Sequence, residues 1–142
     1  MGRKNDYLEH LAEVPLFRAC SRKDLQTLAK HAEDMNVRSG QTLIKEGAVG
    51  AQEFFVIVNG KANVTRNGKK VASLGPGDYF GELALLDRAP RNATVTAASD
   101  MEVVVLAQRD FATVLNDVPG ISHKILAGMA RRLRENDSKR VQ

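Results

Sequence analysis

The dipeptide Asn67-Gly68 lies between two short runs, KANVTR and KKVASL, that are typical of β-strands. Both residues tolerate the positive φ angles of a two-residue hairpin turn, so the pair is a strong signal for a tight β-hairpin. The segments GQTLIKEG, EFFVIVNG and NATVTAASDMEVVVLAQ show similar apolar and β-branched runs, cut by glycine, Gly-Pro-Gly or Ser-Asp turns. Many short strands joined in this way are typical of a barrel or jelly roll. The middle of the chain is therefore predicted to be a β-roll.

Helical periodicity precedes this β-rich region. The segment NDYLEHLAEVPLF carries spaced leucines around a proline, and SRKDLQTLAKHAE follows it. Ser21 is a typical N-cap residue, and Leu25, Leu28 and Ala29 fall on one face of the helix that it would begin. Two short amphipathic helices are therefore expected before the strands.

Helical periodicity also returns after the β-rich region, in RDFATVLND and in ISHKILAGMARRLREN. The second of these segments has an apolar stripe formed by Ile121, Ile125, Met129 and Leu133. The fold class is thus predicted to be mainly β with flanking helices, built on an eight-stranded, jelly-roll-like β-roll. We assign a single domain over 1–142, made of N-terminal helices (1–36), the β-roll (37–107) and two C-terminal helices (108–142).

A length of 142 residues suits one domain. Fractions of 43% hydrophobic and 27% charged residues are typical of soluble globular proteins, and no apolar run approaches the roughly 18 residues of a membrane span. The N-terminal MGRKNDYLEH lacks the apolar core of a secretion signal, so a cytoplasmic location is expected. The single cysteine, Cys20, has no disulfide partner and is predicted to be a buried or half-buried thiol.

The net charge of +4 is compatible with an acidic partner. Part of this charge comes from the C-terminal cluster RRLRENDSKR, which also contains Glu135 and Asp137. This mixture favours a solvated helix end over a contact with nucleic acid, lipid or an acidic protein. No second recognition helix follows, so direct DNA binding is not expected. His10, His31 and His123 fall in predicted helices and not in strands, which argues against a metal-dependent enzyme on a jelly roll. We predict a protein that is not an enzyme and holds no metal or other cofactor.

The stretch FGELALLDRAPRNATV (80–95) places a carboxylate and two arginines among glycine and apolar residues. Its first part, 80–86, is predicted to form one short helical turn opened by Gly81. The N–H groups near the start of such a turn, here those of Leu83 and Ala84, are free to bind an anion.

Arg91 follows this turn, directly after a proline. Its guanidinium has the fork geometry that suits a phosphate, and the N–H groups of Asn92 and Ala93 are placed to complete the cradle. Glu82 would repel a phosphate, so we expect it to accept hydrogen bonds from hydroxyl groups, such as those of a ribose. Together these groups fit a 3′,5′-cyclic nucleotide. The alternative is that Glu82 and Arg91 simply form an ion pair across a loop.

This stretch closely resembles the phosphate-binding cassette of cyclic nucleotide-binding domains, which include protein kinase A regulatory subunits and bacterial cAMP receptor proteins. PLFRACSRKDLQTLAKHAE resembles the N-terminal helices of the family, and SGQTLIKEGAVGAQEFFVIVNGKANV its early strands. AQRDFATVL and ISHKILAGMARRLRE are similar to its closing B and C helices. The resemblance covers nearly the whole chain and implies a cyclic nucleotide-binding regulatory domain.

The resemblance also implies residue roles: Gly81 and Glu82 hold the ribose, while Arg91 and the N–H groups of Leu83, Ala84 and Ala93 hold the cyclic phosphate. Val64 and Leu74 are similar in position to the apolar residues that line the base pocket, and core packing is an equal interpretation of both. Asn92 departs from the family, because cAMP-selective eukaryotic members often have alanine there and cGMP-selective ones threonine. We predict cAMP as the preferred ligand, with cGMP as the alternative.

A binding domain acts as a sensor only if its ligand favours one conformation over another. The C-terminal helix is the expected mover, because in the family it serves as a lid over the base. The output is expected to pass through a protein partner or through an effector domain outside this chain. A third possibility is an interaction module of the same fold that has lost its ligand.

Overall fold

The computed structural model describes residues 8–9, 11–13, 17, 19–49, 53–81, 90–118, 120–124, 126–127 and 130. The chain forms two compact units. One contains Met1–His31 and Ala112–Gln142, and the other contains Ala32–Phe111. The assignment of one domain over 1–142 stays a prediction. Within the described residues, no helix is long and apolar enough to cross a membrane.

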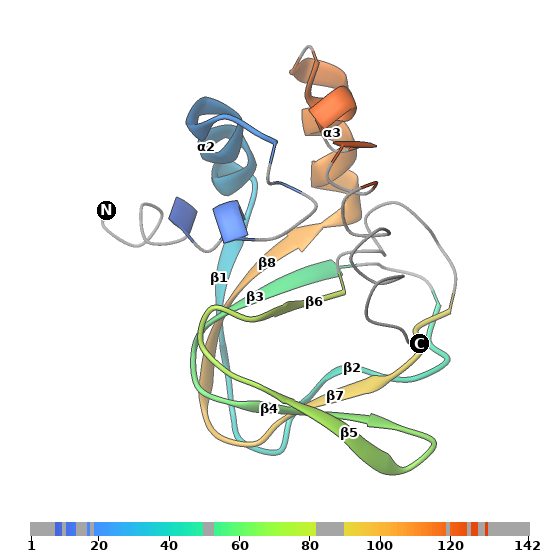
Figure 1. Ribbon diagram of the computed structural model, residues 1–142. Coiled ribbons are helices and arrows are strands. Elements are labelled where there is room, and N and C mark those ends of the chain that lie inside the picture. Colours follow the sequence, from blue (N-terminus) through green and yellow to red (C-terminus); the bar gives the residue numbers. More distant parts are fainter. Residues whose placement is uncertain are drawn as a thin grey trace. The chain divides into compact units, whose positions relative to one another are not determined.

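The unit Ala32–Phe111 is a β-roll of two antiparallel four-stranded sheets (Figure 1). The first sheet has the strand order β1-β8-β3-β6, and the second has the order β2-β7-β4-β5. The prediction of an eight-stranded, mainly β fold is therefore confirmed. The strands are β1 (Glu33–Val37), β2 (Thr42–Ile44), β3 (Glu53–Asn59), β4 (Ala62–Arg66), β5 (Lys69–Leu74), β6 (Tyr79–Phe80), β7 (Thr94–Ala97) and β8 (Met101–Ala107).

The predicted hairpin joins β4 to β5. Asn67 and Gly68 have φ angles of 53° and 79°, as a two-residue turn of this kind requires. The turn brings Arg66 opposite Lys69, and the register shifts by a β-bulge between Val64 and Thr65. The sequence signal thus located both the turn and its two flanking strands.

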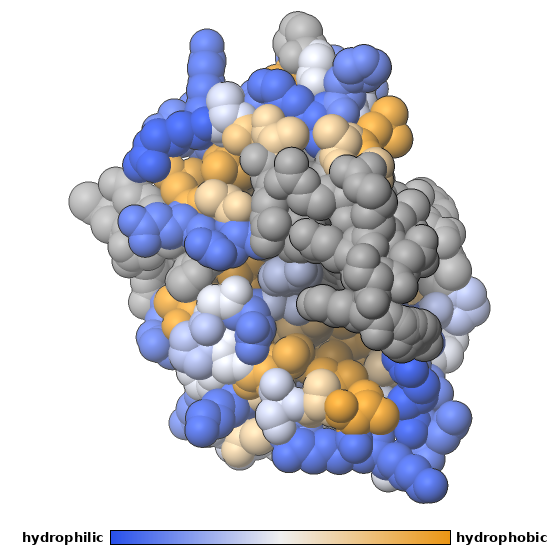
Figure 2. All heavy atoms as spheres, viewed as in Figure 1, coloured by the Kyte–Doolittle hydropathy of each residue, from blue (hydrophilic) through white to orange (hydrophobic). Residues whose placement is uncertain are grey.

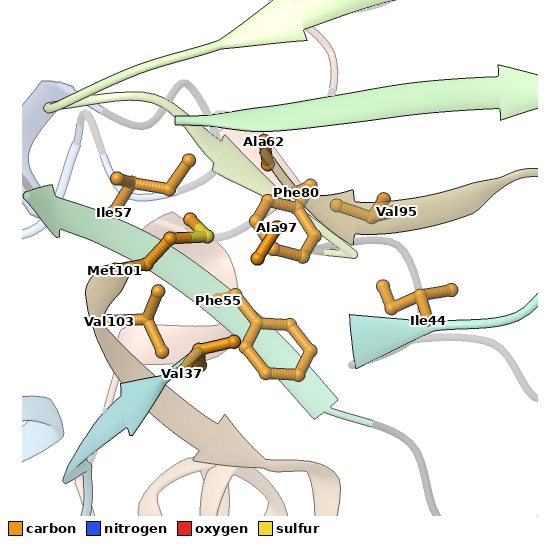
Figure 3. Close-up of a cluster of buried hydrophobic side chains, with 10 residues drawn as sticks. All are labelled: Val37, Ile44, Phe55, Ile57, Ala62, Phe80, Val95, Ala97, Met101 and Val103. Atoms are coloured by element: carbon orange, nitrogen blue, oxygen red, sulfur yellow. The ribbon is translucent and has the colours of Figure 1, made fainter. Parts of the chain in front are cut away.

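The core of the β-roll fills the space between its two sheets (Figure 3). Phe55 and Phe80 come from neighbouring strands of one sheet, and their rings stack with centroids 4.9 Å apart. Ile44 and Val95 point toward them from the other sheet (Figure 3). Burial of such side chains stabilises a fold by about 1.5–3 kcal/mol each. This core fixes the strand ends from which the candidate site is built.

The helical unit contains α2 (Arg22–Lys30), which begins where the sequence predicted. Ser21 caps it, and Asp24 completes a capping box because each side chain accepts a hydrogen bond from the backbone N–H of the other residue. Leu28 is fully buried and Leu25 nearly so, which confirms the predicted apolar face. Cys20 is half-buried as expected, and its desolvation raises the pKa of the thiol to about 11.

A charged pair links α2 to the later part of the chain within this unit. The Nζ atom of Lys124 lies 2.7 Å from Oδ2 of Asp24, whose residue is only 7% exposed. The hydrogen bond from Lys124 lowers the pKa of the Asp24 carboxyl and raises that of the Lys124 ammonium. The charges of this pair are thus satisfied within the unit.

The predicted closing helices are present in the described residues. The first is α3 (Gln108–Asp117), and helical residues follow again at 121–124. Ile121, the first member of the predicted apolar stripe, is fully buried. The other members, Ile125, Met129 and Leu133, lie outside the described residues.

Candidate functional site

Six of the nine predicted ligand-binding residues lie in the described part of the chain: Gly81, Arg91, Asn92, Ala93, Val64 and Leu74. The other three are Glu82, Leu83 and Ala84, which lie outside the described residues. The alternative of an ion pair between Glu82 and Arg91 therefore concerns a residue that the structure does not describe. One boundary of the predicted helical turn was wrong, because Phe80 pairs with Phe55 as part of strand β6.

Arg91 is held by its backbone and by its side chain. Its N–H donates to the carbonyl of Ala48 at 3.0 Å, and its own carbonyl accepts from the N–H of Gly47 at 2.7 Å. Its Nη2 atom donates to the backbone carbonyl of Glu53 at 2.9 Å. The turn at Gly47 and Ala48 and the start of β3 thus fix both the position of this residue and the direction of its guanidinium.

The guanidinium of Arg91 carries its positive charge in a partly buried position. Burial lowers the pKa of the guanidinium, and the nearby charge of Glu53 acts in the opposite direction. Arginine stays charged at any physiological pH despite such a shift. A half-buried guanidinium of this kind has much to gain from an anionic ligand, because the low local dielectric strengthens the attraction.

Gly81 lies directly beside Arg91. Its φ of +83° favours glycine, and a Cβ atom added there would stand 2.8 Å from the Glu53 carbonyl oxygen and 3.1 Å from Nη1 of Arg91. The same Cβ would also come within 3.3 Å of Cδ1 of Ile44. Only glycine allows the chain to pass this close to the guanidinium. The structure therefore brings together the two ends of the predicted cassette.

Asn92 and Ala93 immediately precede strand β7, which begins at Thr94. Asn92 is exposed, whereas Ala93 is 8% exposed. The carbonyl of Asn92 accepts a hydrogen bond from Nε of Arg66, at 3.0 Å. Both residues thus lie before the β7 ladder, as the sequence predicted for amides that would face a phosphate.

Val64 and Leu74 occupy positions between core and surface. Both are half-buried and pack against the core cluster of the β-roll. Val64 is aligned with Ala72 on one side and with Val95 on the other, so the three side chains share one face of the sheet. In Figure 2, apolar side chains lie in a recess in the lower half of the view, bordered by hydrophilic ones. Because both residues are only half-buried, each contributes to core packing and still exposes apolar surface.

Sequence reasoning missed four contributors to this arrangement. Glu53 supplies its backbone carbonyl to the Arg91 side chain, Gly47 and Ala48 hydrogen-bond to the Arg91 backbone, and Arg66 donates to the Asn92 carbonyl. The glycine of KEG was a usable signal for a turn, but nothing in the sequence indicated where that turn lies. Among the described residues, Arg91, Gly81, Asn92 and Ala93 thus form a positively charged corner, which suits an anionic ligand.

Comparison with known proteins agrees with this geometry. A family model described as "Cyclic nucleotide-binding domain" matches residues 34–117. The cAMP-dependent protein kinase regulatory subunit of Eremothecium gossypii is 40% identical over 113 residues, which is 79% of this chain and 24% of that protein. The Cyclic AMP receptor protein of Thermus thermophilus is 30% identical over 128 residues, which is 87% of this chain and 59% of that protein.

A solved structure gives the same result for the fold. The N-terminal domain of a transcriptional regulator from Streptomyces coelicolor A3(2) matches with a TM-score of 0.81 and 32% identity, over 94% of this chain and 99% of that chain. The chain spans about a quarter of the length of the fungal relative and 59% of the bacterial one. From the family match, its extent and the shared β-roll, the chain belongs to the cyclic nucleotide-binding domain family.

Proposed function

We propose that this chain is a sensor domain that binds 3′,5′-cAMP in preference to cGMP. The observation that carries the proposal is the pairing of Arg91 with Gly81. The Glu53 carbonyl directs the guanidinium, which keeps its charge in a half-buried place, and the glycine lets the backbone pass close beside it. A cyclic phosphate supplies the anion that such a corner favours.

The proposed contacts follow the cassette of the family. Gly81 and Glu82 hold the ribose, and Arg91 holds the phosphate together with the N–H groups of Leu83, Ala84 and Ala93. Val64 and Leu74 offer apolar contact to the base. The nucleotide is the only ligand in this proposal, which includes no metal, no cofactor and no catalytic step.

The preference for cAMP rests on the relatives. Two of the three proteins compared above are named for cAMP, one as a cAMP-dependent kinase subunit and the other as a cyclic AMP receptor. Asn92 is exposed, and its carbonyl is engaged by Arg66 while its side-chain oxygen remains a potential acceptor for a guanine amino group. For that reason cGMP is retained as the alternative ligand, and the comparison of the two nucleotides is part of the test.

As a sensor, the chain is proposed to respond to cAMP by a movement of its C-terminal helix. The output then passes to a protein partner or to an effector domain. The expected cytoplasmic location stays a prediction.

The test is calorimetric titration of the purified chain with cAMP, cGMP and 5′-AMP, after unfolding and refolding to remove any nucleotide carried through purification. We expect micromolar or tighter binding of cAMP, weaker binding of cGMP, and no binding of 5′-AMP, whose phosphate is not tied back to the sugar. Tighter binding of cGMP would reverse the assigned preference. No heat and no thermal shift with either cyclic nucleotide would refute the sensor proposal and favour an interaction module.

A further inference from the structure

Arg66 makes a contact that the proposed binding site does not explain. It is the last residue of β4, and its Nε atom donates to the Asn92 carbonyl at 3.0 Å, across 26 positions of sequence. Side chains two apart on a strand share a face, so Arg66 stands on the same face as Val64 and Ala62. This is the face of the core and of the proposed base contact.

Arg66 binds the carbonyl of the Asn92–Ala93 peptide group, and the N–H of that same peptide group is proposed to bind phosphate. The carbonyl of Asn92 and the N–H of Ala93 belong to a single peptide unit, which is trans. In a planar trans peptide these two groups point in opposite directions. Fixing the carbonyl therefore also fixes the direction of the Ala93 N–H, which points away from Arg66.

The preceding peptide group is fixed in the same way. The carbonyl of Arg91 accepts from the N–H of Gly47 at 2.7 Å, and its partner across the peptide plane is the N–H of Asn92. Two successive carbonyls are thus held by outside donors, so two successive N–H groups have fixed directions. Preorganised N–H groups bind an anion well because no reorganisation is needed when it arrives.

Two further hydrogen bonds hold the Arg66 end of the hairpin in place. The N–H of Asn67 donates to Oε1 of Glu46 at 3.0 Å, and the N–H of Glu46 donates to Oγ1 of Thr94 at 2.9 Å. Thr94 directly follows the Asn92–Ala93 segment and pairs with Thr65, the neighbour of Arg66. The hairpin end and the start of β7 are therefore held together both by the Arg66 contact with the Asn92 carbonyl and by the contacts through Glu46 and Thr94.

We propose that Arg66 is a positioning residue for the ligand: by holding the Asn92 carbonyl, it directs the Ala93 N–H toward the cyclic phosphate. Arg66 itself does not touch the nucleotide in this scheme. The inference rests on the proposed function, because it names a role in binding the phosphate of the same nucleotide. It extends the binding site to the β4–β5 hairpin, which lies outside the cassette.

The experiment follows the Ala93 amide by ¹H–¹⁵N NMR during titration with cAMP, in the wild type and in three variants. Arg66→Ala removes the hydrogen bond and the charge. Arg66→Lys keeps the charge but lacks the Nε donor. Lys69→Ala is the matched control, because Lys69 lies directly opposite Arg66 on β5 and carries the same charge.

In the wild type, we expect cAMP to shift the Ala93 amide proton downfield, as a hydrogen bond to phosphate does. Arg66→Ala should lose most of that shift and bind cAMP roughly three- to tenfold more weakly, the scale of one hydrogen bond. Arg66→Lys should resemble Arg66→Ala, and Lys69→Ala should resemble the wild type. The ¹H–¹⁵N spectrum of each variant also shows directly whether it is folded, and Arg66→Lys provides the test if Arg66→Ala does not fold.

Two results would overturn the inference while leaving the proposed function intact. The first is an unchanged Ala93 shift and affinity in both Arg66 variants. The second is an equal loss in Lys69→Ala, which would reduce the effect to charge. A wild-type chain that does not respond to cAMP or cGMP would instead refute the proposed function, and the inference with it.

Discussion

Buried charge is treated differently in the two units of this chain. In the helical unit, Asp24 and Lys124 lie 2.7 Å apart, and each shifts the pKa of the other in the direction that favours its charged form. In the β-roll, the guanidinium of Arg91 donates to the backbone carbonyl of Glu53, and burial, only partly offset by the nearby Glu53 charge, lowers its pKa, which disfavours the charged form. A carbonyl aligns a cation without cancelling its charge, whereas a carboxylate does both.

The difference separates a charge that serves folding from a charge that is kept for a ligand. The pair in the helical unit is satisfied once the unit has formed, so its loss should affect stability. The Arg91 charge gains most when an anion arrives, so its loss should affect binding. The four predictions below test this separation, from the largest expected effect to the smallest.

The largest effect is expected for Arg91→Ala, which should weaken cAMP binding by about 2–4 kcal/mol because it removes one partner of a sheltered, charge-assisted contact. Calorimetric titration measures the loss. Arg38→Ala is the matched control, since it removes the same charge from an exposed position in the same unit. Equal affinities of Arg91→Ala and the wild type for cAMP would contradict the claim that the Arg91 charge serves ligand binding.

Gly81→Ala should destabilise the fold by about 1–3 kcal/mol, since the new residue is forced into a left-handed conformation and its Cβ also meets backbone. The clash is with the Glu53 carbonyl at 2.8 Å, the same group that aims Arg91. Urea denaturation measures the loss. Gly40→Ala is the control, because Gly40 has a similar φ of +91° with nothing within 4 Å of the added Cβ. If both variants lose the same stability, the loss comes from the left-handed backbone conformation alone, and the clash predicted at Gly81 adds nothing to it.

Asp24→Asn should lower stability by about 1–2 kcal/mol and leave nucleotide affinity unchanged, because it removes the charge that Lys124 and the Ser21 N–H share. The effect depends on pH. The folded-state pKa of Asp24 lies below its ordinary value of 3.8, so the charge stabilises the fold fully above that value. The advantage of the wild type should then shrink as pH falls through the lower, folded-state pKa.

Denaturation curves between pH 2 and pH 7 check this prediction. A wild-type advantage that grows as the solution becomes more acidic would contradict the direction of the pKa shift. A loss of cAMP affinity in Asp24→Asn would show that the charged pair also serves binding, and the distinction between the two units would fail.

Lys124→Gln should give the smallest change, a lower thermal midpoint that falls less than that of Asp24→Asn. The side chain of Lys124 is 39% exposed, whereas that of Asp24 is 10% exposed. Water can therefore solvate the ammonium more easily than the carboxylate, so the loss of Lys124 should cost less stability than the loss of the Asp24 charge. Without the ammonium, the pKa of Asp24 should rise toward its ordinary value, and acid unfolding should begin at higher pH. A larger loss of stability than in Asp24→Asn would reverse the order of the two partners.

Much of this molecule could be predicted from short-range patterns. The Asn67-Gly68 turn, the Ser21 cap and the apolar face of α2 depend on residues close in sequence, and the structure has all of them. Arg91 could also be identified from the sequence as a candidate site residue, because an arginine directly after a proline is unusual in a mostly apolar stretch. The spacing from Ser21 to Asp24 is also a local sequence signal, that of a capping box.

The missed features depend on register. Arg66 reads in the sequence as a polar residue before a turn, and only strand pairing brings it to Asn92, 26 positions away. The register of β4 against β5 shifts between Val64 and Thr65, and such a bulge has no clear sequence signature. Similarly, the local pattern of 80–86 predicts a helical turn that includes Phe80. The pairing of Phe80 with Phe55 is a contact between residues far apart in sequence, which that local pattern does not reveal.

Strand β5 has a consequence for the handling of this protein. It is the outer strand of its sheet, and residues 69–73 are all exposed, which is the geometry through which strands of separate molecules join and aggregate. Lys69 and Lys70 place two like charges on that edge, and the bulge opposite Thr65 breaks its regular hydrogen-bond spacing. These are two of the ways in which natural sheets keep an open edge from recruiting another copy, so this β-roll should remain dispersed at the high concentrations that calorimetry and NMR require.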